Sequence, residues 1–401
     1  MPTLTDVADL IMGQSPPSST YNEGGDGLAF FQGKADFGFR HPTPRLFCNA
    51  PLKIAKPHDI LMSVRAPVGP TNIADRECCI GRGLAAIRPR TINGDFLFFN
   101  LRYIEKFIAS LGSGSTFHAI NKTQLGSVEV NEYNFNLPEQ RKIAKVLGLV
   151  QRAMEQQERL LQFTTELKKT LLHQLFTQGL RGEPQKQTEI GPVPESWELV
   201  PLGALAKIGN GSTPKRDNEG YWKGGTIPWL NSAKIHERFI NQADQFVTEL
   251  AVKECHLPRV KPGSLLIAIT GQGKTLGNSA LVSFETCINQ HLAYAQFTTP
   301  KVIPEFVLWF MQTRYEHLRS MSQAGGSTKG ALTCGYLKTY PVPVPSLGEQ
   351  RDIADVFAAL DRKEKVHERK HVAQNDLFRT LLHQLMTAQV HVHALDLPEL
   401  N

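Results

Sequence analysis

One loop in the second half of the chain contains the residues best suited to chemistry. Residues 268–275 read AITGQGKT, at the end of the apolar run SLLIAI. A phosphate-binding loop reads G-x-x-x-x-G-K-[ST] and opens a helix whose first amides hold the phosphates. Here Ala268 occupies the first glycine position, and LGNSALVSF after the loop predicts a turn and a strand. We interpret Gln272, Lys274 and Thr275 as a polar loop on the rim of a domain, with a nucleotide-binding enzyme as the alternative.

Two loops of small residues recur, one in each half of the chain. They read GSGST at residues 112–116 and GGST at residues 325–328, with a lysine further on in each case. Such loops are either simple turns or places where backbone amides and hydroxyl groups approach phosphates. Both interpretations stay open. The candidate residues here are Ser115, Thr116, Lys122, Ser327, Thr328 and Lys329.

Single polar side chains beside predicted strands complete the candidate set. Each alone is typical of a solvated surface group. Together, in two similar segments, they suit contacts with base edges and phosphates of DNA. They are Ser15, Lys34, Arg65, Arg82, Thr213, Lys215 and Lys234, besides Gln272 and Lys274 of the loop above.

Signatures of other enzyme classes are missing from the sequence. It contains no H-E-x-x-H, no G-x-S-x-G, no G-x-G-x-x-G after a strand, and no Asp/Asn-Pro-Pro-aromatic tetrapeptide of an amino-methyltransferase. The six cysteines form no C-x-x-C pair and no metal-ligand spacing, which indicates reduced thiols of a cytoplasmic protein. His173 and His383 occupy equivalent positions and are interpreted as packing residues. We therefore expect no catalytic residue, no metal and no cofactor.

A stretch that occurs twice must position these loops. Residues 139–180 and 349–390 align without a gap at an offset of 210, with 17 of 42 positions identical. Both copies are rich in good helix formers, and in the first copy apolar residues recur at spacings of three and four. Two unrelated surface helices would not repeat in this way, so we expect an antiparallel coiled coil that works as a spacer. The polar middle of the second copy, DRKEKVHERKHVAQND, is expected to face water on most sides.

The segments before the two helices repeat the same order of elements. Each reads as an apolar stretch with a turn, an aromatic-led strand, a Lys-Pro turn with an apolar strand, and a Cys-Ile strand. An amphipathic helix follows at residues 95–111 and 304–321, then the small-residue loop and a strand. This pattern predicts an α/β (α+β) fold with two similar globular domains, separated by the two helices in a pseudo-twofold internal repeat. The predicted boundaries are domains at 1–138 and 184–348 (the latter including the linker 188–203), helices at 139–183 and 349–390, and a tail at 391–401.

The overall composition sets broad limits. The chain has 401 residues, a net charge of +6 and a sequence pI near 8.9. This mild excess of positive charge permits nucleic-acid binding without requiring it. The sequence contains no run of about eighteen apolar residues, so no membrane span is predicted. The start MPTLTDVADLIMG has no signal-peptide pattern.

The chain resembles the specificity subunits of type I restriction–modification enzymes. EQRKIA and EQRDIA at the start of the two helices, LLHQL near their ends and PVPESWELVPLG at 192–203 carry the resemblance, which covers nearly the whole chain. It implies two target recognition domains, each reading one half of an asymmetric, bipartite double-stranded DNA sequence. It also implies helices that set the spacer between the half-sites.

The same resemblance implies partners. The helices would dock two modification (methyltransferase) subunits, and restriction subunits would join the full complex. The chain itself would be non-catalytic and would bind no S-adenosylmethionine, with the partner flipping the target adenine out of the duplex. A coiled-coil scaffold with protein-binding lobes and no DNA contact is the alternative from another class.

Overall fold

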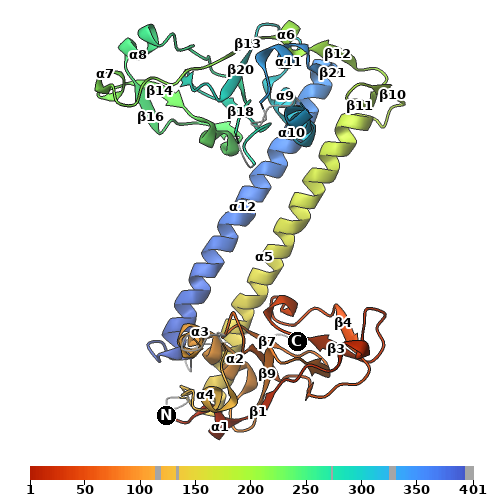
Figure 1. Cartoon of the computed structure of the whole chain (residues 1–401), viewed down its shortest axis with the longest axis vertical. Helices are drawn as coiled ribbons and strands as arrows, with labels where there is room; N and C mark the ends of the chain where they lie inside the picture. The colour runs from red at the N-terminus through yellow and green to blue at the C-terminus, as the bar shows by residue number, and fades with distance from the viewer. Residues whose placement is uncertain (113–118, 132–134, 272–273, 325–330, 393–401) are drawn as a thin grey trace. The chain divides into compact units, whose positions relative to one another are not determined.

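The computed structural model describes residues 1–112, 119–131, 135–271, 274–324 and 331–392 (Figure 1). The chain divides into two compact units. The first unit comprises Met1–Leu161 and His367–Asn401, and the second comprises Gln162–Val366. Two long helices, α5 (Leu137–Gln178) and α12 (Leu347–Met386), each contribute one segment to each unit.

The first unit contains two sheets. One has the strand order β1-β9-β6-β7 and is antiparallel throughout. The other has the order β2-β4-β3-β8-β5, in which β3 runs parallel to β8. The strands are β1 (Ala8–Met12), β2 (Tyr21–Asn22), β3 (Leu28–Phe31), β4 (Leu46–Cys48), β5 (Ile54–Ala55), β6 (Ile60–Ser63), β7 (Thr71–Ile73), β8 (Cys78–Ile80) and β9 (Leu84–Pro89).

Short helices surround these sheets. In the core helix α2 the run from Phe96 to Leu101 is fully buried, so this helix is covered on all sides. The helices are α1 (Leu4–Val7), α2 (Gly94–Tyr103), α3 (Glu105–Leu111), α4 (Lys122–Gly126) and the 3-10 turns η1 (Ser18–Thr20) and η2 (Lys34–Asp36).

The second unit repeats this plan. One sheet has the order β13-β20-β17-β18-β15, and a smaller one the order β16-β14-β19, with β14 parallel to β19. The strands are β13 (Ala206–Asn210), β14 (Ile227–Leu230), β15 (Phe239–Ile240), β16 (Gln245–Val247), β17 (Leu265–Ala268), β18 (Ser279–Val282), β19 (Cys287–Ile288) and β20 (Leu292–Phe297). The order β1-β9-β6-β7 of the first unit thus matches β13-β20-β17-β18, which confirms the mixed α/β fold and the internal repeat.

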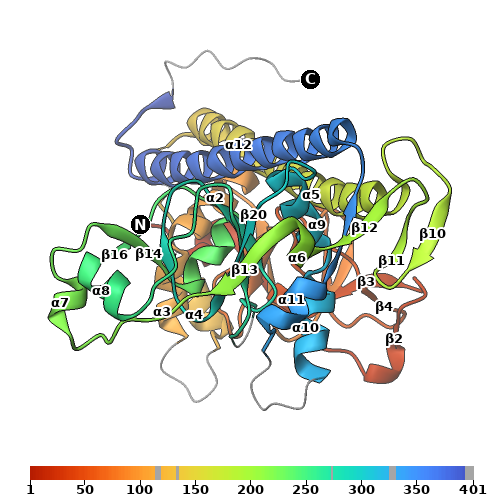
Figure 2. The same ribbon diagram turned by 90° about the horizontal axis from the view of Figure 1, so that it is seen from above.

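The helices of the second unit follow the same sequence of positions. Figure 2 shows β13 beside α6 and α11, three elements that are in contact. The helices are α6 (Leu202–Leu205), α7 (Glu219–Trp222), α8 (Glu249–Glu254), α9 (Pro304–Thr313), α10 (Tyr315–Ala324), α11 (Cys334–Thr339) and the 3-10 turn η3 (Ser232–Glu237).

Each predicted amphipathic helix before the small-residue loop is in fact two helices. The breaks fall at Ile104 (φ −94°, ψ 11°) and Arg314 (φ −96°, ψ 0°). Both residues adopt the bridge region of backbone conformation, which interrupts a helix. The apolar spacing continues across each break, and periodicity therefore did not reveal it.

The linker between the halves is more ordered than its prolines and glycine suggested. It forms the hairpin β10 (Gln185–Thr188) and β11 (Gly191–Pro194), followed by β12 (Glu198–Pro201). Strand β12 pairs with β21 (Pro341–Val344), the predicted strand that leads into α12. In the first unit the corresponding described pairing is a single bridge between Thr3 and Glu129, so the predicted strand before α5 is not found among the described residues.

Within each unit the two long helices pack antiparallel. In the second unit Thr165 and Lys168 of α5 bond to carboxylates of α12. In the first unit Gln157 donates to the carbonyl of His367 at 3.1 Å. Most of the polar middle of α12 is exposed, as predicted, but Asp361 and His367 are buried against α5. The segment therefore faces water on most sides, and its two buried polar groups are hydrogen-bonded to α5.

The repeated EQR segments attach the long helices to the globular parts. Gln140 Oε1 accepts the N–H of Asn93 at 2.9 Å, and Gln350 Oε1 accepts the N–H of Ile303 at 2.8 Å. Asn93 and Ile303 are the N-caps of α2 and α9. Both glutamines are buried and also donate to the carbonyl five residues before them. The same side chain therefore fixes the same junction in both units.

No helix in the described part of the chain combines the length and the apolar character that crossing a membrane requires.

Candidate nucleic-acid interface

Four loops of the first unit bring polar side chains together. The segment after β1 lies against the β8–β9 turn, where Ser15 Oγ accepts the N–H of Arg82 at 3.2 Å. Arg65, after β6, forms a backbone bridge with Ala119. A cavity of about 520 Å³ lies between these loops and the start of α4. We call the set Ser15, Arg65, Arg82, Asn121 and Gln124 the first loop cluster.

The second unit builds an equivalent cluster with different side chains. The Thr213 hydroxyl bonds to Gln290 Oε1, and Thr270 Oγ1 bonds to His291 Nδ1. The backbone contact beneath is the same in both units: the residue before Ser15 donates to the Ile80 carbonyl at 3.0 Å, and the residue before Thr213 donates to that of Ile288 at 3.0 Å. We call Thr213, Thr270, Gln290 and His291 the second loop cluster.

Gln290 and His291 were missed by the sequence reasoning. The signal that identifies them is the match between CIGRGLAAIRP and CINQHLAYAQF, which places Gln290 opposite Arg82. Both side chains are exposed, as are those of Arg65 and Arg82. Exposed arginine and glutamine on rigid loops present hydrogen-bonding groups that suit the edges of guanine and adenine. The two clusters thus share a scaffold and differ in recognition chemistry.

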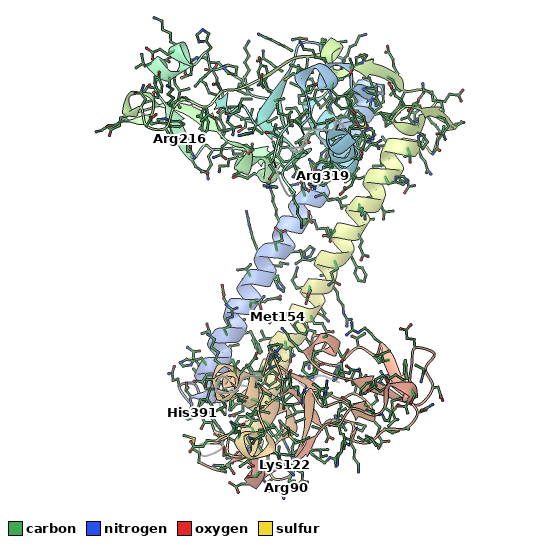
Figure 3. The ribbon with its side chains drawn as sticks, in the orientation of Figure 1. Arg90, Lys122, Met154, Arg216, Arg319 and His391 are labelled. Carbon is green, nitrogen blue, oxygen red and sulfur yellow. The ribbon has the colours of Figure 1, made fainter. Side chains whose placement is uncertain are left out.

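The predicted lysines Lys122, Lys215 and Lys274 are exposed near these clusters in the chain. Lys122 opens α4 between Asn121 and Gln124 of the first loop cluster (Figure 3). The carbonyl of Lys274 accepts bonds from Tyr315 and Asn278, whereas its ammonium group has no partner among the described residues. These side chains remain available for an anionic ligand.

The loop around Lys274 also bears on the nucleotide-binding alternative. It joins β17 to β18, which pair as an antiparallel hairpin, as the sequence predicted. A helix at this point would be needed to supply the amides and the dipole that hold a triphosphate. The observed hairpin therefore weighs against a phosphate-binding loop.

Two other predicted lysines lie in different surroundings. Lys34 lines a separate cavity of about 850 Å³ together with Arg45. Lys234 is paired with Glu237 at 2.6 Å and Asp244 at 3.0 Å, and these carboxylates raise the pKa of its ammonium group. Its charge is therefore already matched inside the unit. The candidates Ser115, Thr116, Gln272, Ser327, Thr328 and Lys329 lie outside the described residues.

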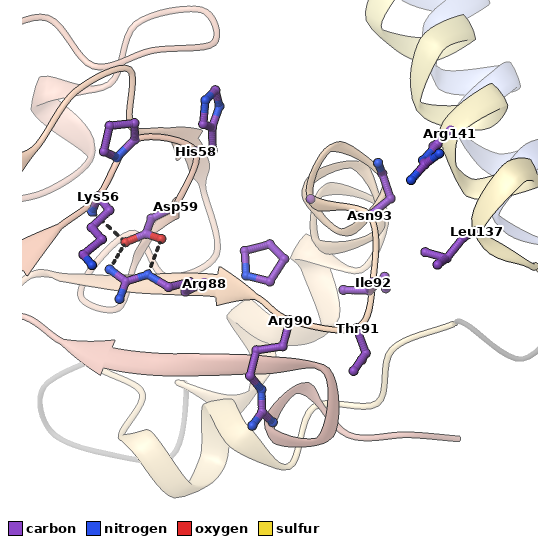
Figure 4. A pocket seen from close by; sticks show the side chains of 13 residues that line it. Lys56, His58, Asp59, Arg88, Arg90, Thr91, Ile92, Asn93, Leu137 and Arg141 are labelled. Atoms are coloured by element: carbon purple, nitrogen blue, oxygen red, sulfur yellow. Dashed lines mark hydrogen bonds and ion pairs between the residues drawn. The ribbon is translucent and has the colours of Figure 1, made fainter.

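A third cavity, of about 560 Å³, is lined by several basic side chains, and the charge of one of them, Arg88, is matched by Asp59. Figure 4 shows Arg88 directed at Asp59, with bonds of 2.9 and 2.7 Å from Nε and Nη2. Asp59 is buried, and its hydrogen bond raises the pKa of Arg88. The pair serves to hold β6 against β9 (Figure 4).

Two buried cysteines of the first unit are poor candidates for a reactive thiol. Burial raises the pKa of Cys78 to about 12 and that of Cys79 to about 11, so both thiols stay protonated at neutral pH. A protonated thiol is a poor nucleophile. Among the described residues no group of three His, Cys, Asp or Glu side chains is placed to hold a metal ion.

The repeated fold and its two loop clusters define a protein of two similar α/β units whose equivalent loops carry different side chains. A sequence model of the family described as "Type I restriction modification DNA specificity domain" matches residues 1–162 and 194–373. The chain belongs to this family.

Individual relatives agree with this assignment. A Methanocaldococcus jannaschii protein assigned as the MjaX type I restriction enzyme specificity subunit is 44% identical over 174 residues, covering 43% of this chain and 40% of that protein. The MjaIX specificity subunit of the same organism is 31% identical over 195 residues, covering 47% and 43%. The chain thus spans about two-fifths of the length of these two relatives.

A solved structure shares the fold. The S subunit of a type I restriction–modification system from M. genitalium has a TM-score of 0.65 at 17% identity, covering 96% of this chain and 94% of that one. At this identity the likeness concerns the fold alone.

Proposed function

We propose that this chain is the DNA-binding specificity subunit of a type I restriction–modification complex. Each recognition domain, at residues 1–138 and 184–348, reads one half of an asymmetric bipartite duplex target. The observation that carries the proposal is the pair of loop clusters. They occupy equivalent places on equivalent backbones, yet one offers Arg65 and Arg82 and the other offers Gln290 and His291. Two readers with different side chains suit a target whose halves differ.

We further propose that the long helices set the spacer and dock two modification subunits, with restriction subunits joining them. Supporting this, the helices carry apolar side chains that remain exposed. On α5 these include Phe163 (64% exposed) and Leu167, and on α12 Val372 (60% exposed) and Leu377. Docking of a partner on these helices would remove this apolar surface from water, which favours association. The chain supplies recognition, while the cofactor and the catalytic groups belong to its partners.

Selection from a randomised duplex library tests the proposal. The purified chain, alone and with its modification subunits, is expected to enrich two short motifs at a fixed separation. Its affinity should fall steeply between 50 and 200 mM salt, because each phosphate contact releases counterions. Lys274→Ala should weaken binding to all sequences alike and lower the salt slope by roughly one. If no motif and no salt-dependent duplex binding emerge with the partners present, the chain is a scaffold and the proposal is wrong.

A further inference from the structure

Two tryptophan side chains hydrogen-bond to the segment that carries Thr213. Trp229 Nε1 donates to the Ser212 carbonyl at 3.2 Å, and Trp222 Nε1 donates to the Lys215 carbonyl at 3.0 Å. The two indole rings meet edge to face, with centroids 5.2 Å apart. Residues 212–215 therefore form a rigid loop, because two of their carbonyls are fixed on an aromatic pair.

Arg216, at the end of this loop, lies on the same aromatic pair. Its guanidinium carbon is 3.9 Å from the ring centroid of Trp222 and 5.0 Å from that of Trp229. Nη2 donates to Gln245 Oε1 at 2.8 Å. Nε and Nη1 have no hydrogen-bond partner among the described residues, and the side chain is exposed (Figure 3). The guanidinium is thus fixed in place while much of its donor edge stays unsatisfied.

In the first unit an aromatic pair also holds the equivalent loop, but that loop has no arginine. Tyr21 donates through its hydroxyl to the Pro16 carbonyl at 2.7 Å, and its ring packs on Phe30 at 4.6 Å between centroids. Phe30 pairs with β8 as Trp229 pairs with β19. The loop there continues with Pro17 and Ser18, and the unit places its guanidinium at Arg82 instead. Only the second unit therefore presents an arginine from this loop.

We propose that Arg216 reads a guanine in the half-site bound by the second unit, an inference that rests on the proposed function. Arginine recognises guanine by donating to O6 and N7 in the major groove. Stacking on an aromatic ring and the bond to Gln245 reduce the rotamer entropy lost on binding. A contact to phosphate gains less from such pre-organisation, since phosphate accepts donors over a wide range of directions.

The test compares variants of the full chain in the duplex-library selection. Arg216→Gln is expected to lose the preference for one G·C pair in one half-site by roughly 5- to 150-fold and to leave the other half-site unchanged. Arg216→Lys should retain part of that preference, because lysine also donates to guanine. Lys223→Gln is the matched control: this exposed cation of the same region, paired only with Glu219, should change neither half-site.

A second measurement leaves the protein unaltered. Replacing that guanine by 7-deazaguanine removes the N7 acceptor, so wild-type affinity should fall toward that of Arg216→Gln, and the variant should not respond. A uniform loss of affinity across sequences with a smaller salt slope would mean a phosphate contact and overturn the inference, as would an unchanged motif. A wild-type chain that selects no motif would contradict the proposed function itself, and the inference with it.

Discussion

At the scale of single residues, each unit has an arginine that binds its own long helix at an equivalent position, but the acceptor is an amide in one unit and a carboxylate in the other. Arg40 Nη1 donates to Gln151 of α5 at 3.1 Å, and Arg238 donates to both carboxylate oxygens of Asp361 at 2.7 Å. Gln151 and Asp361 are equivalent at the offset of 210. The carbonyls of Arg40 and Arg238 each accept a strand N–H at 2.8 Å, from β7 and β18. We call this contact the clamp. In the first unit Arg40 binds an uncharged amide of its helix, with its own charge matched by Asp95 at 2.6 Å, whereas in the second unit Arg238 forms an ion pair with its helix.

A second pair of equivalent residues, Lys168 and Phe378, also differs between the two units. Lys168 is buried beside Asp361, with its ammonium 5.3 Å from the Trp309 centroid. Its equivalent in the first unit is Phe378, which packs on Phe99 at 6.0 Å between centroids. A buried charge needs a partner, whereas a buried phenyl ring does not. Lys168 is therefore compatible with Asp361, and Phe378 with Gln151, so that a change at one position requires a change at the other.

This coupling predicts the outcome of a mutant cycle. Asp361→Ala should lower the free energy of unfolding of the second unit by roughly 3 kcal/mol, since it leaves Arg238 unpaired and Lys168 with Glu364 alone. The double change Lys168→Phe with Asp361→Gln copies the first unit and should lose only about 1 kcal/mol. Urea unfolding measures both. Asp376→Ala, which removes an exposed carboxylate of α12, is the control. A double variant less stable than Asp361→Ala would refute the coupling.

Some side chains of the candidate interface were predictable from the sequence, and others were not, for physical reasons. Ser15, Arg65 and Arg82 were predicted, and they meet because β1, β6 and the β8–β9 turn end at one place. Lys234 is indistinguishable in sequence from an unpaired lysine, because its partner Asp244 approaches only through the fold. Arg216 was missed because its significance lies in its contacts with Trp222 and Trp229.

At the scale of elements, helix ends explain the repeated EQR motif. The buried glutamine satisfies a helix N-cap and a carbonyl before its own helix, as Gln140 does for Asn93 and Phe135. The carbonyl is buried and the N–H is half-buried, so a bond inside the protein stabilises both groups. The C-terminal ends of the long helices are also anchored. Leu382 and Leu385 of α12 pack in the core of the first unit, and Leu175 of α5 packs in that of the second.

Removing this glutamine should weaken the junction. Gln140→Ala leaves the half-buried N–H of Asn93 and the buried carbonyl of Phe135 without these partners, which should cost roughly 1–3 kcal/mol of unfolding free energy. Denaturant unfolding of the variant measures the loss. Gln178→Ala, an exposed position at the other end of α5, should change stability by less than about 0.5 kcal/mol. Equal effects of the two changes would show that the buried bonds do not stabilise the junction.

The helices offer a second prediction, for the spacer. Inserting seven residues into both α5 and α12, after Leu161 and after Val366, keeps the heptad phase. It lengthens each helix by roughly 10 Å, the rise of about three base pairs. The gap between half-sites selected from a duplex library should grow by about that amount while the half-sites stay the same. An unchanged gap would remove the spacer role from the helices.

The long helices were predictable because their composition and their repeat act over some forty residues. The order of elements along each half was predictable from matching segments such as KPHDILMSVRAPVG and KPGSLLIAITGQGK, whereas the strand order within the sheets was not predicted. The breaks at Ile104 and Arg314 were not predictable, because a single residue in the bridge region leaves the apolar spacing intact. The hairpin of β10 and β11 was missed for a similar reason, since proline and glycine mark turns without specifying which strands pair.

At the scale of the whole molecule, the two halves repeat their scaffold and diverge in their loops. Arg82 faces Ser15 in one half, whereas Gln290 faces Thr213 in the other. We propose that these halves are independent readers of one bipartite target. Independence means that one reader can be replaced without disturbing the other, provided the clamp to its helix is retained.

Exchanging residues 184–345 for the corresponding domain of a relative tests that claim most directly. The exchange should keep Arg238, so that its contact with Asp361 is preserved. Methylation mapping in a host that carries the complete system then reports the recognised sequence before and after the exchange. We expect one half of the methylated motif to change while the other half is retained. A motif that changes in both halves, or in neither, would contradict this proposal.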